Sequence, residues 1–177
     1  MDESKHPSDV RLSAMRGQNV KILFMDIADI DEVLSIERAS FANPWTKNMF
    51  LQELQFHFSQ SMVAKIEGHS KTQIVGYIIY WLISGESHLQ KIATKPDFRR
   101  YGISSILMQE MIRHSLENNC IFCFLEVRKS NQQAIKLYEK SGFSVRGIRP
   151  MYYSETGEDA VIMAADLRKS KKLIQHE

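Results

Sequence analysis

The hydrophobic positions follow two different spacings along the chain, and these spacings predict the order of its elements. Short runs in which apolar residues alternate with polar ones, or stand together, predict strands. Stretches in which apolar residues recur every three or four positions predict helices. The predicted strands are 20–27, 61–67, 73–84, 88–95, 121–127, 143–149 and 159–167, and the predicted helices are 29–41, 47–56, 103–118 and 131–142.

Capping residues mark the ends of three predicted helices. Asp29, with Glu32 three residues later, is a candidate N-cap for the first helix, and Thr46 is one for the second. The last helix is expected to begin at Asn131 as its N-cap and to stop at Gly142. The pattern therefore predicts both the type of these elements and where they end.

This order of elements predicts one mixed α/β (α+β) domain at 20–168, with no internal repeat and no Pro/Gly linker. We expect a central mixed, twisted sheet of about seven strands, flanked by about four helices. The unit from 88 to 127 should make a right-handed crossover between parallel strands. The nearly all-apolar run 121–127 is typical of a strand covered on both faces. Residues 1–19 are expected to form a flexible tail and 169–177 a basic, solvated tail.

Composition excludes some classes of partner. The 177 residues include 23 basic and 21 acidic side chains, a net charge of +2, which argues against a general nucleic-acid binder. No apolar run approaches the roughly 20 residues that cross a bilayer, so no membrane partner is expected. The first 18 residues lack the apolar centre of a secretory signal. A cytoplasmic protein is therefore the expectation.

Two cysteines form the motif CIFC at Cys120 and Cys123. This spacing occurs in redox and metal sites, but the motif overlaps a strand-like run, and the chain has no second cysteine pair or neighbouring histidine cluster. We therefore expect buried core thiols, which is the common fate of free cysteine. The chain also lacks an HExxH motif, and no metal is expected.

The stretch PDFRRYGISS combines two arginines and a glycine directly before a predicted helix. The first backbone N–H groups of a helix have no partner within the helix, and a glycine lets an anion approach them closely. Arg99, Arg100 and Gly102 could therefore hold a phosphate group. The same residues could equally form a tight turn with solvated arginines, and this stretch by itself does not decide between the two.

The surrounding motifs resemble the GNAT superfamily of N-acetyltransferases. The family's acetyl-CoA signature is Q/R-x-x-G-x-G/A, and this chain has Arg99, Gly102 and Ser104 at the three defined positions, with serine replacing the usual Gly or Ala. The phrases IERASFANPW, LEVRKSNQQAIKLYEKSGF and RPMYYSETGEDAVIM resemble the ribosomal-protein alanine N-acetyltransferases and related N-terminal acetyltransferases. The resemblance covers about 20–167 and implies acetyl-CoA as the co-substrate.

The resemblance also implies which residues bind acetyl-CoA. In the family, main-chain groups of the strand before the loop hold the acetyl group and the pantetheine arm. The loop and the first N–H groups of the next helix bind the pyrophosphate. A later helix adds contacts to the CoA arm. The matching positions here are Ile92, Ala93, Thr94, Arg99, Arg100, Tyr101, Gly102, Ile103, Ser104, Ser105, Asn131 and Tyr138.

Glu126 is the candidate general base. It directly follows the apolar run 121–125, where an unpaired carboxylate would be costly to bury. From the residues themselves, a salt bridge to Arg128 or Arg149 is favoured over catalysis. The resemblance matches Glu126 to the family's general base, which would deprotonate an acceptor amine directly or through one water.

Tyr138 is the candidate general acid. It shares a helix stripe with Ala134, which by itself indicates a core aromatic residue. The resemblance implies that its hydroxyl protonates the departing CoA thiolate. Transfer would then be direct, with backbone N–H groups near Thr94 stabilising the oxyanion and with no covalent enzyme intermediate.

The acceptor site is expected between two aromatic segments. In the resembled enzymes these segments flank the groove for the substrate N-terminus, although each residue could also belong to the core or to an interface. The implied acceptor is the N-terminal α-amino group of a protein, for example a ribosomal protein, and the alternatives are a small-molecule amine or a non-catalytic CoA-binding module. A monomer or weak homodimer is expected. The candidate acceptor-binding residues are Phe41, Pro44, Trp45, Tyr152 and Tyr153.

Overall fold

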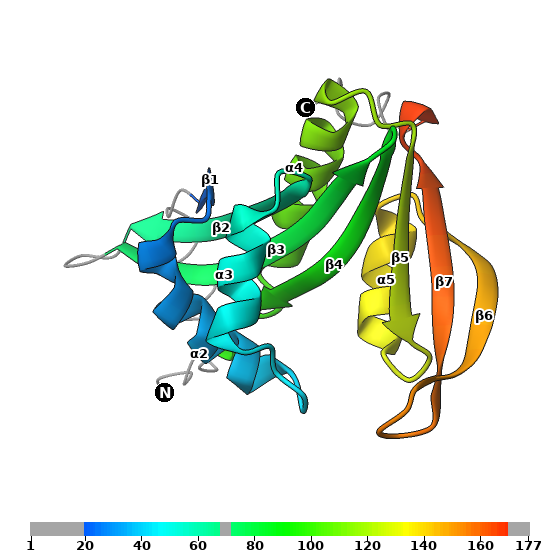
Figure 1. Ribbon diagram of the computed structural model, residues 1–177, viewed down its shortest axis with the longest axis horizontal. Coiled ribbons are helices and arrows are strands. Elements are labelled where there is room, and N and C mark those ends of the chain that lie inside the picture. Colours follow the sequence, from blue (N-terminus) through cyan, green and yellow to red (C-terminus); the bar gives the residue numbers. More distant parts are fainter. Residues whose placement is uncertain (1–19, 68–71, 170–177) are drawn as a thin grey trace, which may run out of the picture.

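The computed structural model describes residues 20–67 and 72–169, and its core is a seven-stranded sheet (Figure 1). The predicted tails at 1–19 and, apart from Lys169, at 169–177 lie outside these residues. The strands are β1 (Val20–Phe24), β2 (Ser59–Glu67), β3 (Thr72–Ile83), β4 (Glu86–Thr94), β5 (Phe122–Arg128), β6 (Ser144–Tyr153) and β7 (Glu158–Asp166). The helices are α2 (Ile30–Ser40), α3 (Lys47–Gln55), α4 (Ile103–Glu117) and α5 (Gln132–Lys140), with short 3-10 turns η1 (Ile27–Asp29) and η2 (Pro96–Phe98).

The strand order is β1-β2-β3-β4-β5-β7-β6. β4 and β5 pair in parallel, whereas every other neighbouring pair is antiparallel. The helix α4 connects the two parallel strands, as a crossover connection of this kind requires. The predicted mixed sheet of seven strands with four flanking helices is confirmed.

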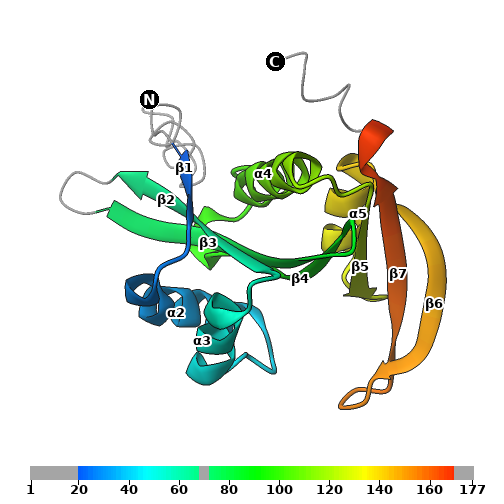
Figure 2. The ribbon, with the colours of Figure 1, turned by 45° about the horizontal axis from the view of Figure 1, so that its top comes forward.

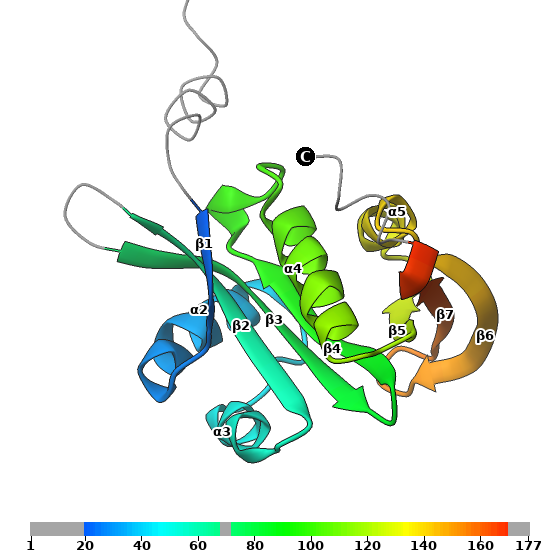
Figure 3. The ribbon, with the colours of Figure 1, turned by 90° about the horizontal axis from the view of Figure 1, so that it is seen from above.

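The helices cover the two halves of the sheet unequally. α2 and α3 pack on one face of β1–β4, and α4 packs on the opposite face (Figures 2 and 3). α5 lies on the same side as α4, and its Tyr138 belongs to the hydrophobic cluster that α4 forms with β5. The face of β5–β7–β6 that corresponds to the α2 and α3 side therefore carries no helix among the described residues.

The sheet divides between β4 and β5. These strands pair over only three positions, from Glu86 opposite Phe122 to His88 opposite Phe124, and then diverge (Figure 1). A register shift at Gln90 interrupts the pairing of β4 with β3 at the same level. Beyond this point β4 and β5 no longer pair with each other, so each strand has one edge without a strand partner. The main-chain N–H and C=O groups along these edges need other hydrogen-bond partners.

The prediction that β5 is covered on both faces is wrong. Cys123, Leu125 and Val127 are buried on the side of α4 and α5, but Phe122 on the opposite face is 38% exposed, and Glu126 is also exposed. The apolar run looked continuous because Phe122 and Phe124 occupy the open face. The Phe124 ring packs against Phe122 and stacks on His88, and no helix of the described residues covers them.

Capping follows the prediction at two of the three predicted N-caps. Thr46 and Asn131 accept hydrogen bonds from the N–H groups three residues later, at 3.4 and 3.1 Å. Asp29 occupies the predicted N-cap position of α2, but its carboxylate makes no cap bond to that helix. It accepts instead from the backbone N–H of Asp26 at 3.0 Å and from Lys65 Nζ at 2.6 Å.

Three further expectations concern the cysteines, metal sites and membranes. Cys120 and Cys123 are both free and buried, which confirms the prediction of core thiols. Among the described residues, no His, Cys, Asp and Glu side chains gather in the groups of three or more that could hold a metal ion. Within the same ranges, no helix combines the length and apolar character needed to cross a membrane.

Candidate active site

A cleft of about 1470 Å³ opens where β4 and β5 diverge. Its walls come from both strands, the α2–α3 loop, the loop before α4, one face of α5, and the β6–β7 hairpin. Pro44 and Tyr101 are absent from its lining, since Pro44 is exposed in the turn before α3 and Tyr101 is half-buried in the loop before α4. The other predicted site residues all line this cleft.

The start of α4 forms one end of the cleft. Gly102 is the N-cap residue with φ +82°, and Arg100 is also left-handed at φ +67°. A glycine offers no side chain to cap the helix, so the N–H groups of its first turn remain available to an external anion. Ile103, Ser104 and Ser105, which form this first turn, line the cleft.

Arg99 and Ser104 tie this loop to the rest of the molecule. Arg99 donates from Nε to the Thr94 carbonyl oxygen at 3.3 Å and from Nη2 to Ser40 Oγ at 3.2 Å. The Ser104 hydroxyl lies 2.8 Å from the Thr94 hydroxyl. The serine that departs from the family's Gly or Ala therefore anchors the loop to β4, and Arg100 is an exposed cation that lines the cleft.

Gly76 allows α4 to lie close to the sheet. A Cβ at this position would come within 2.9 Å of both the Ala93 carbonyl oxygen and Ile103 Cγ2. The absence of a side chain therefore brings together the first turn of α4 and the free edge of β4, where Ile92, Ala93 and Thr94 line the cleft.

Glu126 lies on the open face of β5, beyond the point where the strands separate. Its Oε1 is 2.8 Å from Arg149 Nη1. Of the two salt-bridge partners proposed from the sequence, Arg149 is therefore the one found. Arg128 instead pairs with Glu155 and Glu158 in the β6–β7 hairpin.

An irregularity in β6 brings Tyr152 to Glu126. The pairing with β7 shifts between Arg149 and Tyr153, and Met151 in this segment has φ +51°. Bulges of this kind redirect side chains at the edges of sheets. A hydrogen bond to Glu126, together with partial burial, raises the pKa of Tyr152 above its ordinary value.

Tyr138 reaches the cleft from α5, on the other side of the sheet from Glu126. Its ring is buried and lies 6.1 Å from the ring of Phe143. Burial raises the pKa of the Tyr138 phenol well above its ordinary value, because the phenolate would be poorly solvated there. The hydroxyl therefore stays protonated at neutral pH and can donate a proton or a hydrogen bond.

The α2–α3 loop forms the aromatic wall that includes Phe41 and Trp45. The Trp45 backbone N–H donates to Glu37 Oε1 at 2.7 Å, and the Phe41 ring lies under Lys91 Nζ at 3.8 Å from its centroid. Neither Glu37 nor Lys91 was predicted as a site residue. A signal for Glu37 was present, because it continues the α2 stripe of Val33 and Leu34 at helical spacing and is therefore a buried acid.

Comparison with known proteins identifies related chains. A family model described as the acetyltransferase (GNAT) family matches residues 30–143. A Bacillus subtilis protein, provisionally assigned as a [ribosomal protein bS18]-alanine N-acetyltransferase, is 36% identical over 140 residues, which cover 78% of this chain and 90% of that protein. An N-alpha-acetyltransferase of Sulfurisphaera tokodaii is 32% identical over 167 residues, which cover 87% of this chain and 97% of that protein.

Among solved structures, the ribosomal-protein-S18-alanine N-acetyltransferase of Escherichia coli is similar in fold. Its TM-score is 0.75 at 28% sequence identity, and the match covers 84% of this chain and 94% of that one.

Proposed function

The chain belongs to the acetyltransferase (GNAT) family, and on this premise we propose that it acetylates the N-terminal α-amino group of a protein. The family's reaction is N-acetyl transfer from acetyl-CoA, so the chain is an N-acetyltransferase. The proposal concerns the acceptor and the residues that act on it. It rests on one observation above all, which is that Glu126 stands on the open face of β5 between two aromatic walls.

The shape of the open face suits an extended peptide. Phe41 and Trp45 stand on one side, and Tyr152 and Tyr153 on the other, with rings 5.2 Å apart in an edge-to-face arrangement. No helix covers β5 on this side in the described residues, so a chain can enter without displacing an element. Several relatives carry names that specify an N-terminal or alanine α-amino acceptor, which favours a protein acceptor such as a ribosomal protein.

The other end of the cleft suits the CoA portion of the donor. The uncapped first turn of α4 and the exposed Arg100 can hold the pyrophosphate, and the free edge of β4 can pair with the amides of the pantetheine arm. Asn131, at the start of α5, lines the route between them. Acetyl-CoA supplies the acetyl group as a thioester, placed between Thr94 and Glu126.

Glu126 and Tyr138 carry out the two proton transfers of the reaction. Glu126 accepts a proton from the acceptor's ammonium group, directly or through a water, so that the nitrogen lone pair can attack the acetyl carbon. The new C–N bond forms as the C–S bond breaks, and Tyr138 gives its proton to the leaving thiolate. Because the two side chains reach the cleft from opposite faces of the sheet, proton removal and proton delivery occur on opposite sides of the acetyl carbon.

The acceptor class can be tested by competition between peptides and small amines. Peptides that begin with Ala, Ser or Met would be compared with spermidine and with free amino acids, all with acetyl-CoA, by following release of the CoA thiol. We expect kcat/KM to be highest for peptides, because only they fill the groove between the aromatic walls. Turnover confined to the small amines would overturn the proposal.

A further inference from the structure

A lysine side chain lies half-buried at the aromatic wall of the acceptor groove. Lys91 projects from β4 and is 13% exposed, with its Nζ 3.8 Å from the centroid of Phe41 and 5.1 Å from that of Trp45. All three residues line the cleft. The ammonium group therefore contributes to the surface that an acceptor entering along this wall would meet.

Glu37 holds this lysine in place. Its carboxylate is fully buried and accepts from Lys91 Nζ at 2.7 Å, from the Trp45 backbone N–H at 2.7 Å, and from the Tyr77 hydroxyl. One buried acid thus fixes both the cation and the backbone of the aromatic wall. A lysine held in this way loses little further side-chain freedom when it binds a ligand.

The register shift at Gln90 determines which way Lys91 points. Leu89 and Ile92 both pack into the cluster under α4, although a regular strand would place residues three apart on opposite faces. The extra residue at the shift lets Lys91 point to the α2 side, where it bonds Glu37, and both Gln90 and Lys91 line the cleft. The irregularity therefore adds a cation to the acceptor side next to the main-chain groups of Ile92.

We propose that Lys91 contacts the first side chain of the acceptor and selects one that carries a hydrogen-bond-accepting oxygen, as Ser, Thr and Asp do. This inference rests on the proposed function, since it requires an acceptor N-terminus at Glu126. A side chain extending from that first residue toward the α2–α3 loop meets Phe41, Trp45 and the Lys91 ammonium.

The hydrogen-bonding capacity of the ammonium favours oxygen. Lysine has three donors, and within the described residues Glu37 is the acceptor that Lys91 bonds, while the aromatic rings stabilise its charge. An apolar side chain placed against it would remove water from the two remaining donors without replacing the lost hydrogen bonds. A site built to hydrogen-bond a side-chain oxygen discriminates strongly against the isostere that lacks it.

Two isosteric pairs of acceptors test this selection. Peptides identical except for their first residue, Thr against Val and Ser against Ala, would be assayed with acetyl-CoA and the full chain. We expect kcat/KM to be about tenfold higher for Thr than for Val, and higher for Ser than for Ala. In Lys91→Met, which keeps an unbranched apolar stem over Phe41, both ratios should fall to about one.

Controls separate selection from damage to the fold. Because Lys91→Met leaves the Glu37 charge buried without its cation, the double variant Glu37→Gln with Lys91→Met would be measured beside it and should show the same loss of preference. Lys47→Met, which removes an exposed partner of Asp31, should keep the wild-type ratios. Thermal unfolding would confirm that each variant is folded.

The possible outcomes are distinct. Peptides acetylated by the wild type without preference for Thr over Val would overturn the role of Lys91 and leave the proposed function standing. A preference that persists in the folded double variant would do the same. If no peptide is acetylated at its α-amine while small amines are, the proposed function fails, and the selection by Lys91 fails with it.

Discussion

The two halves of the sheet differ in how they are covered. In β1–β4, helices pack on both faces, and Tyr77, Ile78 and Tyr80 along β3 are fully buried. In β5–β7–β6, α5 covers one face, and most residues of β6 are exposed. The first half has the burial of a stable core, whereas the second presents side chains to an incoming molecule.

This difference shows how the fold makes room for chemistry without losing its core. β4 belongs to the covered half and β5 to the open half, and the cleft lies between them. The donor can therefore rest against a rigid edge, while the acceptor approaches a face that no helix occupies in the described ranges. Changes in the open half should affect catalysis, and changes in the covered half should affect stability.

The largest expected effect is at Glu126 in the open half. Glu126→Gln removes the proton acceptor but keeps the size of the side chain, so kcat/KM for a peptide should fall roughly a thousandfold. The free energy of unfolding should change by less than about 1 kcal/mol, because the side chain and Arg149 are both partly exposed. Steady-state kinetics and urea unfolding measure the two effects.

Glu117→Gln is the matched control for this loss. Glu117 is an exposed acid at the end of α4 that pairs with Arg113 four residues earlier. Its removal should leave kcat/KM unchanged. If Glu126→Gln were as active as this control, with acetyl-CoA binding intact in both, Glu126 would not be the base.

The next largest effect is expected at Tyr138, which joins the two halves through α5. Tyr138→Phe removes the proton donor and should lower kcat roughly a hundredfold. Because burial raises the pKa of Tyr138, its protonated form should persist well above pH 9. Between pH 7 and 9, the wild-type kcat and the Tyr138→Phe kcat should therefore change with pH in the same way. A pH–rate profile of both enzymes checks this.

Gly76 tests the covered half. In Gly76→Ala the new Cβ would collide with the Ala93 carbonyl oxygen and with Ile103, and a backbone oxygen cannot move without β4. We expect the free energy of unfolding to fall by about 1–3 kcal/mol. Gly147→Ala in β6 is the matched change in the open half, where the added Cβ would be 3.9 Å from Ile162, and it should cost less than about 0.5 kcal/mol. Equal losses in urea unfolding would contradict the contrast between the halves.

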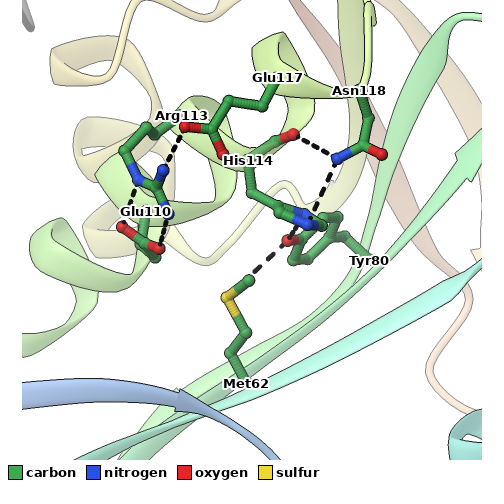
Figure 4. Close-up of polar contacts among 7 residues, drawn as sticks. All are labelled: Met62, Tyr80, Glu110, Arg113, His114, Glu117 and Asn118. Atoms are coloured by element: carbon green, nitrogen blue, oxygen red, sulfur yellow. Dashed lines mark hydrogen bonds and ion pairs between the residues drawn. The ribbon is translucent and has the colours of Figure 1, made fainter.

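The smallest expected effect is a pH dependence of stability at His114 in the covered half. Its Nδ1 lies 2.7 Å from the Tyr80 hydroxyl, and Asn118 contacts its Nε2 (Figure 4). Burial lowers the pKa of His114 below its ordinary value near 6.5, so near pH 6 the unfolded chain binds more protons than the folded one.

The contribution of His114 to stability is therefore present above about pH 6.5 and is lost as the pH falls through the lower folded value. Since the ring is partly exposed, we expect a loss of only about 0.5 kcal/mol between pH 7.5 and 5. Urea unfolding at both pH values should show this loss in the wild type but not in His114→Gln. An equal pH dependence in the two proteins would contradict this assignment.

The sequence predicted the elements better than their relation to one another. Strands and helices follow from spacing, and Thr46, Asn131 and Gly142 act locally, so their roles could be inferred from neighbouring residues. Asp29 stands at the predicted N-cap position of α2, but its carboxylate bonds Lys65, 36 residues away, in place of the N–H groups of the helix. A capping rule considers only the adjacent turn and cannot include a partner of that kind.

The split between β4 and β5 could not be predicted from the sequence. The runs 88–95 and 121–127 have the pattern of strands that could pair throughout, and nothing in them marks the end of pairing at His88. The same apolar run predicts burial of Phe122 and Phe124, because nothing in it marks the face of β5 that carries no helix in the described residues. The partner of Glu126 also remained open between two arginines, because the irregular register of β6 determines that Arg149 reaches it.

The most direct test of the central claim is the position of the transferred acetyl group on a single acceptor. A peptide that begins with serine and contains an internal lysine offers both an α-amine and an ε-amine. After incubation with acetyl-CoA and the wild-type chain, tandem mass spectrometry should find the acetyl group on the α-amine alone, and Glu126→Gln should abolish it. Acetylation mainly at the lysine side chain would contradict the account of an acceptor N-terminus held at Glu126.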